Sequence, residues 1–277
     1  MALRMLLGVD GSACCKAATR IALDLLARVD GAELTALTVV NVVTSSGSFL
    51  KDLAGRLGFE PAVVPPEVEQ RFVEQAEELL AGIQARAEAQ GLHVKTVLEH
   101  GAVLDRILHA ARQADLLVIG NRGETEERFP GQGGAHVYDV VASAPCPVLI
   151  APEGAEPVRH VVIGYDGSVA ASHALGALRR LTDKIPLEVH AVLVDRDGHG
   201  DPHVLDVVAE QLPGAVVRTH VVQASMVREG VLKLAAQEHA NLLAVGFEGK
   251  SRLRDFLFGS TAEYLLTDHS LMLLVAH

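Results

Sequence analysis

Two stretches of the chain carry glycines at the same spacing and could bind a phosphate group. In GFEGKSRLRDFLFGST, residues 246–261, Gly246, Gly249 and Gly259 form the pattern G-x2-G-x9-G, and Ser260 and Thr261 follow. Glycines allow tight turns in which backbone N–H groups approach an anion, and the free N–H groups at a helix N-terminus favour phosphate. The two hydroxyls can donate further hydrogen bonds, so this stretch predicts an anion site.

The second stretch, GNRGETEERFPGQGG at residues 120–134, keeps the spacing but changes the chemistry. Gly120, Gly123 and Gly133 fit the same pattern, and Gly134 stands where the serine would be. Residues 122–128 hold three glutamates and two arginines, whereas residues 248–255 hold three basic residues, Lys250 among them, and two acidic ones. A phosphate therefore meets less favourable charge in the first stretch, although backbone donors remain.

Other phosphate motifs fit poorly. A P-loop needs a glycine where Ala244 stands, and no G-x-G-x-x-G follows a first strand, which disfavours a nicotinamide enzyme. The chain has no G-x-S-x-G and no H-E-x-x-H, and no general base can be named beside the glycine loops. We therefore predict no catalytic residues and favour binding over catalysis.

The elements that must position these loops occur twice. RMLLGVDGSACCKAATRIALDLL resembles HVVIGYDGSVAASHALGALRRL, so that Asp10 matches Asp166; ADLLVIGNRG resembles ANLLAVGFEG, so that Gly120 matches Gly246. The chain is a tandem repeat whose first copy carries about 30 extra residues after its second strand. The boundary falls in the proline-containing linker near residues 152–158, which predicts domains at 1–153 and 158–277.

Each copy alternates apolar strands with amphipathic helices. In the first copy we expect strands at Met5–Val9, Leu34–Val42, His93–Leu98, Leu116–Gly120 and Pro147–Ala151, and helices at Ala13–Val29, Glu67–Gln90, Val103–Arg112 and Gly134–Ala142. Strands that are apolar throughout are expected where helices cover both sheet faces. The prediction is an α/β protein of two tandem doubly wound domains, each a mainly parallel five-stranded sheet.

Composition limits the binding partners and the cellular compartment that we expect for this protein. The net charge of −11 argues against a nucleic-acid or anionic-membrane binder, and aromatic residues make up only 4% of the chain. Three cysteines form no disulfide framework, and no apolar run approaches the roughly 18 residues of a membrane span. We expect a cytoplasmic protein with no nucleic-acid or membrane partner.

A few reactive side chains have a more ordinary interpretation. Asp195, Asp197, His199, Asp201 and His203 could ligate a divalent metal, but their spacing fits no closed zinc motif, and we expect a solvated loop and no metal. Cys14 and Cys15 lie near a helix start, where a thiolate is somewhat favoured, yet on an alanine-rich helix we expect them to pack, and Cys146 to be structural.

Nearly the whole chain resembles the universal stress protein family in a tandem two-domain form. Nucleotide-binding members show G-x2-G-x9-G-[ST] after the fourth strand and an Asp at the end of the first. The second copy matches with Asp166, Gly246, Gly249, Gly259 and Ser260; the first matches with Asp10, Gly120, Gly123 and Gly133 and departs at Gly134. APCPVLIAP, residues 144–152, resembles the family's final strand.

The resemblance implies a regulatory stress-response protein that binds ATP, or ADP or AMP, mainly in the second copy, with Mg²⁺ recruited through the phosphates. Asp166 would contact the nucleoside and Leu193 would form the apolar adenine wall, with a one-residue shift left open; Val39 is the candidate in the first copy. The final strands would pair the copies as a pseudo-dimer, and two chains could form a homodimer. The insert Thr44–Pro66 could be a lid or a partner surface. Slow ATP hydrolysis, autophosphorylation and a nucleotide-free interaction module remain alternatives.

Overall fold

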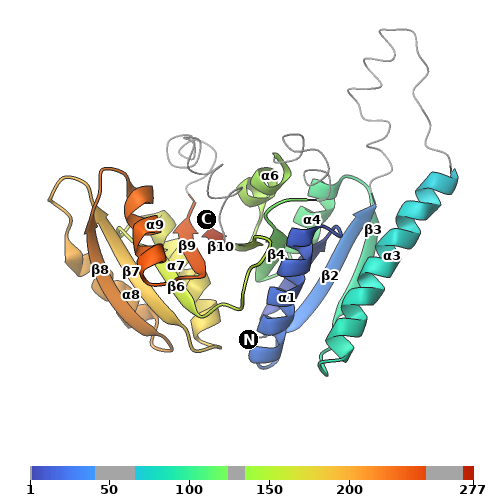
Figure 1. Ribbon diagram of the computed structural model, residues 1–277, viewed down its shortest axis with the longest axis horizontal. Helices are drawn as coiled ribbons and strands as arrows, with labels where there is room; N and C mark the ends of the chain where they lie inside the picture. The colour runs from blue at the N-terminus through green and yellow to red at the C-terminus, as the bar shows by residue number, and fades with distance from the viewer. Residues whose placement is uncertain (1, 41–65, 124–134, 248–270) are drawn as a thin grey trace, which may run out of the picture.

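One continuous sheet runs through the molecule. The computed structural model describes residues 2–40, 66–123, 135–247 and 271–277 (Figure 1). In these ranges the strand order is β3-β2-β1-β4-β5-β10-β9-β6-β7-β8. The strands are β1 (Arg4–Val9), β2 (Glu33–Val40), β3 (Lys95–His100), β4 (Leu116–Gly120), β5 (Val148–Ala151), β6 (His160–Gly164), β7 (Glu188–Asp195), β8 (Val216–Gln223), β9 (Leu242–Gly246) and β10 (Met272–Ala276).

Each half of the sheet has the predicted doubly wound arrangement. Within the first half β1 pairs with β2 and β4 in parallel, and the order 3-2-1-4-5 recurs from β8 to β10 in the second half. The halves meet where β10 pairs antiparallel with β5, with Leu273 opposite Ile150 and Val275 opposite Val148. Both strands are buried along their whole length. The pairing removes the exposed apolar edge that each half would otherwise present to solvent.

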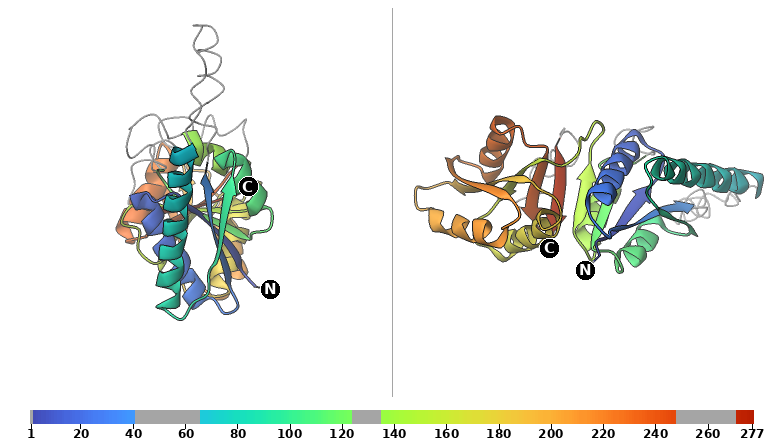
Figure 2. Two further views of the ribbon diagram at one scale, coloured as in Figure 1. Left: turned by 90° about the vertical axis from the view of Figure 1, so that its right-hand side faces the viewer. Right: turned by 90° about the horizontal axis from the view of Figure 1, so that it is seen from below.

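Helices cover both faces of the sheet, as Figure 2 shows in its view from below. One apolar cluster joins the sheet to α1 (Ala13–Arg28), α3 (Pro66–Glu88), α7 (Val169–Thr182) and α8 (Asp206–Gln211). The other joins it to α4 (Val103–Ala111), α6 (Ala135–Ser143) and α9 (Val227–Gln237). This burial on both sides explains why the strands are apolar throughout. No described helix is long and apolar enough to span a lipid bilayer.

Polar contacts fasten the two halves and the linker between them. The Asp115 carboxylate, at the start of β4, lies 3.1 Å from Arg4 Nε in its own half and 3.6 Å from Arg180 Nη1 on α7 of the other half. The Asn241 amide Nδ2 donates to the carbonyl oxygen of Pro157 in the linker. One ion pair thus joins the two halves beside the β5–β10 pairing, and a side chain of the second half holds the linker.

The expected elements differ from the observed ones mainly at their ends. β3 begins at Lys95 and not at His93, because Gly91 adopts a left-handed φ of 71° and the chain needs residues 92–94 to turn into the sheet. The second copy replaces the 23-residue α3 with a short 3₁₀ turn, Pro202–Leu205, and the six-residue α8. The insert Thr44–Pro66 lies outside the described residues except for Pro66, where α3 begins.

Candidate functional site

The sequence Asp-Gly-Ser after β1 forms a tight helix cap. Gly11 has φ = 82°, a left-handed conformation that favours glycine. The Ser12 N–H donates to Asp10 Oδ1 at 3.0 Å, and Ser12 Oγ accepts from the Cys15 N–H at 2.9 Å, which caps α1. The Asp-Gly-Ser motif therefore caps α1, a role for which Asp and Ser are well suited. It leaves the exposed Asp10 carboxylate at the carboxyl end of β1.

The second copy repeats this geometry after β6. Gly167 has φ = 78°, the Ser168 N–H donates to Asp166 Oδ1 at 2.9 Å, and Ser168 Oγ accepts from the Ala171 N–H at 3.2 Å. Asp166 is exposed, as Asp10 is. Both copies thus present one carboxylate at the strand end where ligands of doubly wound sheets bind.

The first glycine of each loop makes room for the first turn of the neighbouring helix. A Cβ on Gly120 would lie 2.8 Å from Cys14 Cβ in the first turn of α1. A Cβ on Gly246 would overlap the carbonyl group of Ala170 in the first turn of α7. From the sequence, we expected the glycines of this pattern to let the backbone approach a bound anion. In the structure the group that approaches is the capped helix, whose start is thereby held against the end of the fourth strand.

The second glycine of the first copy lies against the aspartate. A Cβ on Gly123 would be 3.1 Å from Asp10 Oδ2, and Gly123 does not have a positive φ, so proximity and not backbone strain favours glycine here. The Ser12 hydroxyl also donates to the Arg122 carbonyl oxygen at 3.2 Å. The loop after β4 is therefore fastened to the loop after β1, although Asp10 and Gly123 are far apart in sequence.

Strand register places the corresponding parts of the second copy in the same relation. Met5 on β1 pairs with Leu116 on β4, and the equivalent Val161 on β6 pairs with Leu242 on β9. The two registers are identical. Asp166 therefore lies relative to the end of β9 as Asp10 lies relative to the end of β4. The described residues thus bring Asp166 and Gly246 to one edge of the sheet.

The candidate adenine-contacting residues are not equivalent in the two copies. Leu193 is buried on the sheet face covered by α7 and α8, whereas Val39 packs on the opposite face with α4 and α6. The sheet pairs Gly8 with Leu37 and Gly164 with Val192, so the equivalent of Leu193 is Thr38. Val39 is therefore one residue away from the true equivalent of Leu193, which is the shift that the sequence left open. Contact of either residue with a nucleotide stays a prediction.

The residue after the first glycine distinguishes the copies, a point that sequence reasoning missed. In the first copy Asn121 is only 6% exposed, and its Oδ1 has no hydrogen-bond partner in the part of the chain that the structure describes. In the second copy Phe247 takes this place and packs on His277 with ring centroids 5.3 Å apart. The first copy thus carries an amide where the second carries an aromatic ring.

The remaining candidates lie outside the described residues. These are Gly133 and Gly134 of the first copy and Gly249, Lys250, Gly259, Ser260 and Thr261 of the second. Their places in a phosphate site stay predictions from sequence.

The cysteines pack in the core. Cys14, Cys15 and Cys146 are buried, and none of the three forms a disulfide. Burial raises the pKa of Cys15, and the nearby Asp10 carboxylate raises it further. Burial also raises the pKa of Cys146 to about 11. Both thiols are therefore protonated at neutral pH, which supports the packing interpretation and not that of a reactive thiolate.

In the loop of histidines and aspartates after β7, the Asp195 side chain accepts hydrogen bonds from the backbone. Its Oδ1 accepts from the N–H groups of Gly198, His199 and Gly200 at 2.8–3.2 Å. Burial by itself raises the pKa of Asp195, but these N–H donors together outweigh it and lower the pKa. The Asp195 carboxylate thus shapes the loop, and its Oδ1 atom is already engaged by backbone N–H groups.

Sequence reasoning overlooked another group of side chains. His190, His220 and Glu238 come together from separate elements.

Comparisons with known proteins agree with this architecture. The sequence model of the universal stress protein family matches residues 1–152 and 199–277. A universal stress protein of Synechocystis is 26% identical over 206 residues, covering 73% of this chain and 71% of the relative. A universal stress protein structure from Archaeoglobus fulgidus aligns over 99% of this chain and 95% of its own with a TM-score of 0.70 at 21% identity. A functionally unknown Pseudomonas aeruginosa protein aligns over 99% and 92% with a TM-score of 0.56 at 14% identity.

Proposed function

Because this chain belongs to the universal stress protein family, we propose that it binds an adenine nucleotide in its second half in a regulatory stress-response role. ATP is the first choice and ADP or AMP the alternatives, with Mg²⁺ recruited through the phosphates. Asp166 and Leu193 would contact the nucleoside. The stretch from Gly246 to Thr261 would hold the phosphates. The proposed domains are 1–153 and 158–277, and the proposed compartment is the cytoplasm.

The observation that carries the proposal is the identical strand register in the two copies. In the first copy, where the structure describes the loop as far as Gly123, this register brings the loop into contact with Asp10. The second copy has the same register, so Gly246 at the end of β9 lies at the same edge of the sheet as Asp166, and we expect the loop that follows to lie beside Asp166 as well. A carboxylate beside a glycine loop can accept hydrogen bonds from sugar hydroxyls while the loop's N–H groups donate to phosphate.

Charge and hydroxyl content favour the second copy as the principal site. Lys250, Arg252 and Arg254 supply positive charge to the second loop, and Ser260 and Thr261 add two donors. The first loop replaces the serine with Gly134 and carries an excess of glutamate. We therefore expect weaker nucleotide binding in the first copy.

The position of the proposed phosphate residues in the chain supports a regulatory role. Thr261 is followed after ten residues by β10, the strand that pairs with β5 of the other half. Contacts of residues 259–261 with phosphates would restrain the chain that enters that strand. Nucleotide occupancy could thus alter the pseudo-dimer contact between the halves, the pairing of two chains as a homodimer, or the binding of a partner.

Calorimetric titration with ATP tests the nucleotide site. The double variant Gly259→Val with Ser260→Val should weaken ATP binding by about 10- to 100-fold, since hydrogen bonds to a charged group contribute about 1.5–3 kcal/mol. The matched control is Gly133→Val with Gly134→Val, which makes the same change in the first copy and should leave the main affinity unchanged. Equal ATP affinity in wild type and in the second-copy variant would remove the proposed site.

A second variant separates recognition from folding. Asp166→Asn retains an oxygen that can accept the Ser168 N–H, so the cap of α7 and the stability of the protein should persist. The charge that would face the nucleoside is lost, so ATP binding should weaken.

Native mass spectrometry of the protein as purified from cells would also report ATP, ADP or neither. Purification without nucleotide, together with no ATP binding in solution, would favour an interaction module.

A further inference from the structure

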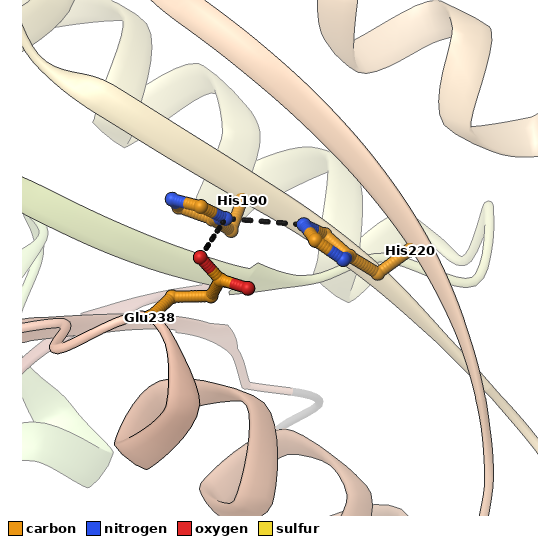
Figure 3. Close-up of side chains that lie close together, drawn as sticks. All are labelled: His190, His220 and Glu238. Atoms are coloured by element: carbon orange, nitrogen blue, oxygen red, sulfur yellow. Dashed lines mark hydrogen bonds and ion pairs between the residues drawn. The ribbon is translucent and has the colours of Figure 1, made fainter.

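Two histidines and a glutamate converge on the face of the sheet beneath α9. His190 lies on β7, His220 lies on the neighbouring β8, and Glu238 is the residue that ends α9. Figure 3 shows the three side chains pointing toward one another. His190 Nδ1 is 3.0 Å from His220 Nε2 and 3.6 Å from the nearer Glu238 carboxylate oxygen. One ligand atom from each residue can be chosen so that all three lie within 4.8 Å of one another.

These distances fit the ligand set of a divalent transition metal. Zinc binds histidine nitrogens and carboxylate oxygens at about 2.0–2.2 Å, so neighbouring ligand atoms in a tetrahedral site are about 3.4 Å apart. The two measured separations, 3.0 and 3.6 Å, lie on either side of that value. Two imidazoles and one carboxylate would leave the fourth position to water. The hard cations Ca²⁺ and Mg²⁺ prefer sites made of oxygen ligands only, which this cluster does not offer.

A further carboxylate lies beside the buried histidine. Glu188 Oε1 lies 3.5 Å from His190 Nε2, the ring nitrogen that faces away from the cluster, and Arg218 Nη1 lies 2.9 Å from the same oxygen. Metal-binding histidines commonly donate their second ring N–H to a carboxylate, which fixes the tautomer and the ring orientation. A proton on Nε2 leaves the Nδ1 lone pair of His190 directed at His220 and Glu238.

His190 is the most buried member of the cluster, with 1% of its side chain exposed. Burial lowers the pKa of His190 and favours the neutral ring, while the attraction of Glu238 acts in the opposite direction. His220 and Glu238 are half-buried. The cluster also lies at the carboxyl end of α9, where the helix dipole favours a cation.

The cluster is separate from the proposed nucleotide site. His190 and Leu193 are three residues apart on β7, which is about 10 Å along the strand. Odd spacing also directs their side chains to opposite faces of the sheet. The nucleotide site is proposed at the carboxyl ends of the strands, whereas Glu238 follows a helix that returns toward their amino ends.

We propose that His190 Nδ1, His220 Nε2 and a carboxylate oxygen of Glu238 form a binding site for a divalent transition metal, with Zn²⁺ the best fit. In the metal-free state the two facing ring nitrogens share one proton at 3.0 Å. When the metal binds, that proton moves to the outer nitrogen of His220, and both facing lone pairs become ligands. The metal ties α9 to the two outermost strands of the second half.

Zinc binding to untagged, chelator-treated full-length protein tests the site. Titration against a coloured zinc indicator should reveal one equivalent of tight binding in the wild type. His220→Ala and Glu238→Gln change half-buried groups, so both variants should fold, and each should bind Zn²⁺ at least 10-fold more weakly. Zn²⁺ should raise the melting temperature of the wild type and have little effect on the two variants.

The control is His203→Ala, which removes an exposed histidine paired with Asp206 in the loop after β7. This variant should bind zinc as the wild type does. Loss of binding in His203→Ala but not in His220→Ala would place the metal in that loop and overturn the proposal. Absence of zinc binding to the folded wild type would do the same. With Co²⁺ as a probe, a tetrahedral visible spectrum should appear in the wild type and vanish in His220→Ala.

Discussion

Adding one methyl group to Gly246 or Gly120 should separate a helix start from the sheet. In Gly120→Ala the new Cβ would lie 2.8 Å from Cys14 Cβ, whereas ordinary contacts begin at 3.4 Å, so the first turn of α1 must move by about 0.6 Å. In Gly246→Ala the methyl group would overlap the Ala170 carbonyl, and α7 must move further. In both variants the contacted atoms are backbone atoms of a capped helix or a Cβ fixed to that backbone, so side-chain rotation cannot relieve the contact.

The expected cost follows from these distances. Overpacking in a well-packed region costs about 1–3 kcal/mol, and we assign Gly120→Ala to that range and Gly246→Ala to its upper end or beyond. Gly176→Ala is the matched control. Gly176 lies within α7, and among the described residues no atom beyond its own stretch of helix lies within 4 Å of the added Cβ. A helical glycine replaced by alanine gains about 0.5–1 kcal/mol. The same chemical change should therefore have opposite signs at Gly176 and Gly246.

Urea unfolding followed by circular dichroism measures the difference. The expected order of unfolding free energies is Gly176→Ala above wild type, followed by Gly120→Ala and then Gly246→Ala. Because α7 carries the Ser168 cap beside Asp166, Gly246→Ala should also weaken ATP binding. A Gly246→Ala protein as stable as the wild type would refute the packing argument. It would return the glycine to the role that sequence suggested, that of admitting a ligand.

Two further predictions concern polar groups that stabilise the fold. Ser168→Ala and Ser12→Ala each remove an N-cap acceptor, so each should lower the unfolding free energy by about 1 kcal/mol; an unchanged urea midpoint in both would contradict the capping geometry. The hydrogen bonds from Arg4 lower the pKa of Asp115 below its unfolded value, so its stabilising effect is present above about pH 4 and fades as the pH falls through the folded pKa. Asp115→Asn should therefore be less stable than wild type at pH 7 and approach it in acid. An equal stability gap at both pH values, measured by urea unfolding, would show that the charge of Asp115 does not stabilise the fold.

Much of the architecture follows from local sequence pattern. Apolar strands alternating with amphipathic helices specify a doubly wound sheet, because strands buried on both faces must be apolar throughout. Repetition of the Asp-Gly-Ser cap at Asp10 and Asp166 identifies two copies of one unit. The spacing of the glycines is equally local, since it depends only on the order of residues around a turn and a helix start. These features required no knowledge of contacts between distant parts of the chain.

Other features depend on contacts between distant residues. Gly246 must be glycine because Ala170, 76 residues earlier, approaches its Cα. The inequivalence of Leu193 and Val39 depends on strand register, since a shift of one residue reverses the face of the sheet to which a side chain points.

The metal cluster shows the same division between sequence and tertiary structure. Sequence pattern drew attention to histidines that are close along the chain, from His199 to His203, in a loop where Asp195 is occupied by backbone N–H groups. The residues that converge are His190, His220 and Glu238, which are 18 or more residues apart and belong to three elements. The sequence by itself therefore determined the repeated unit and its layers. Strand register and helix packing decided which side chains meet, because only the folded sheet places residues on different strands within hydrogen-bonding distance.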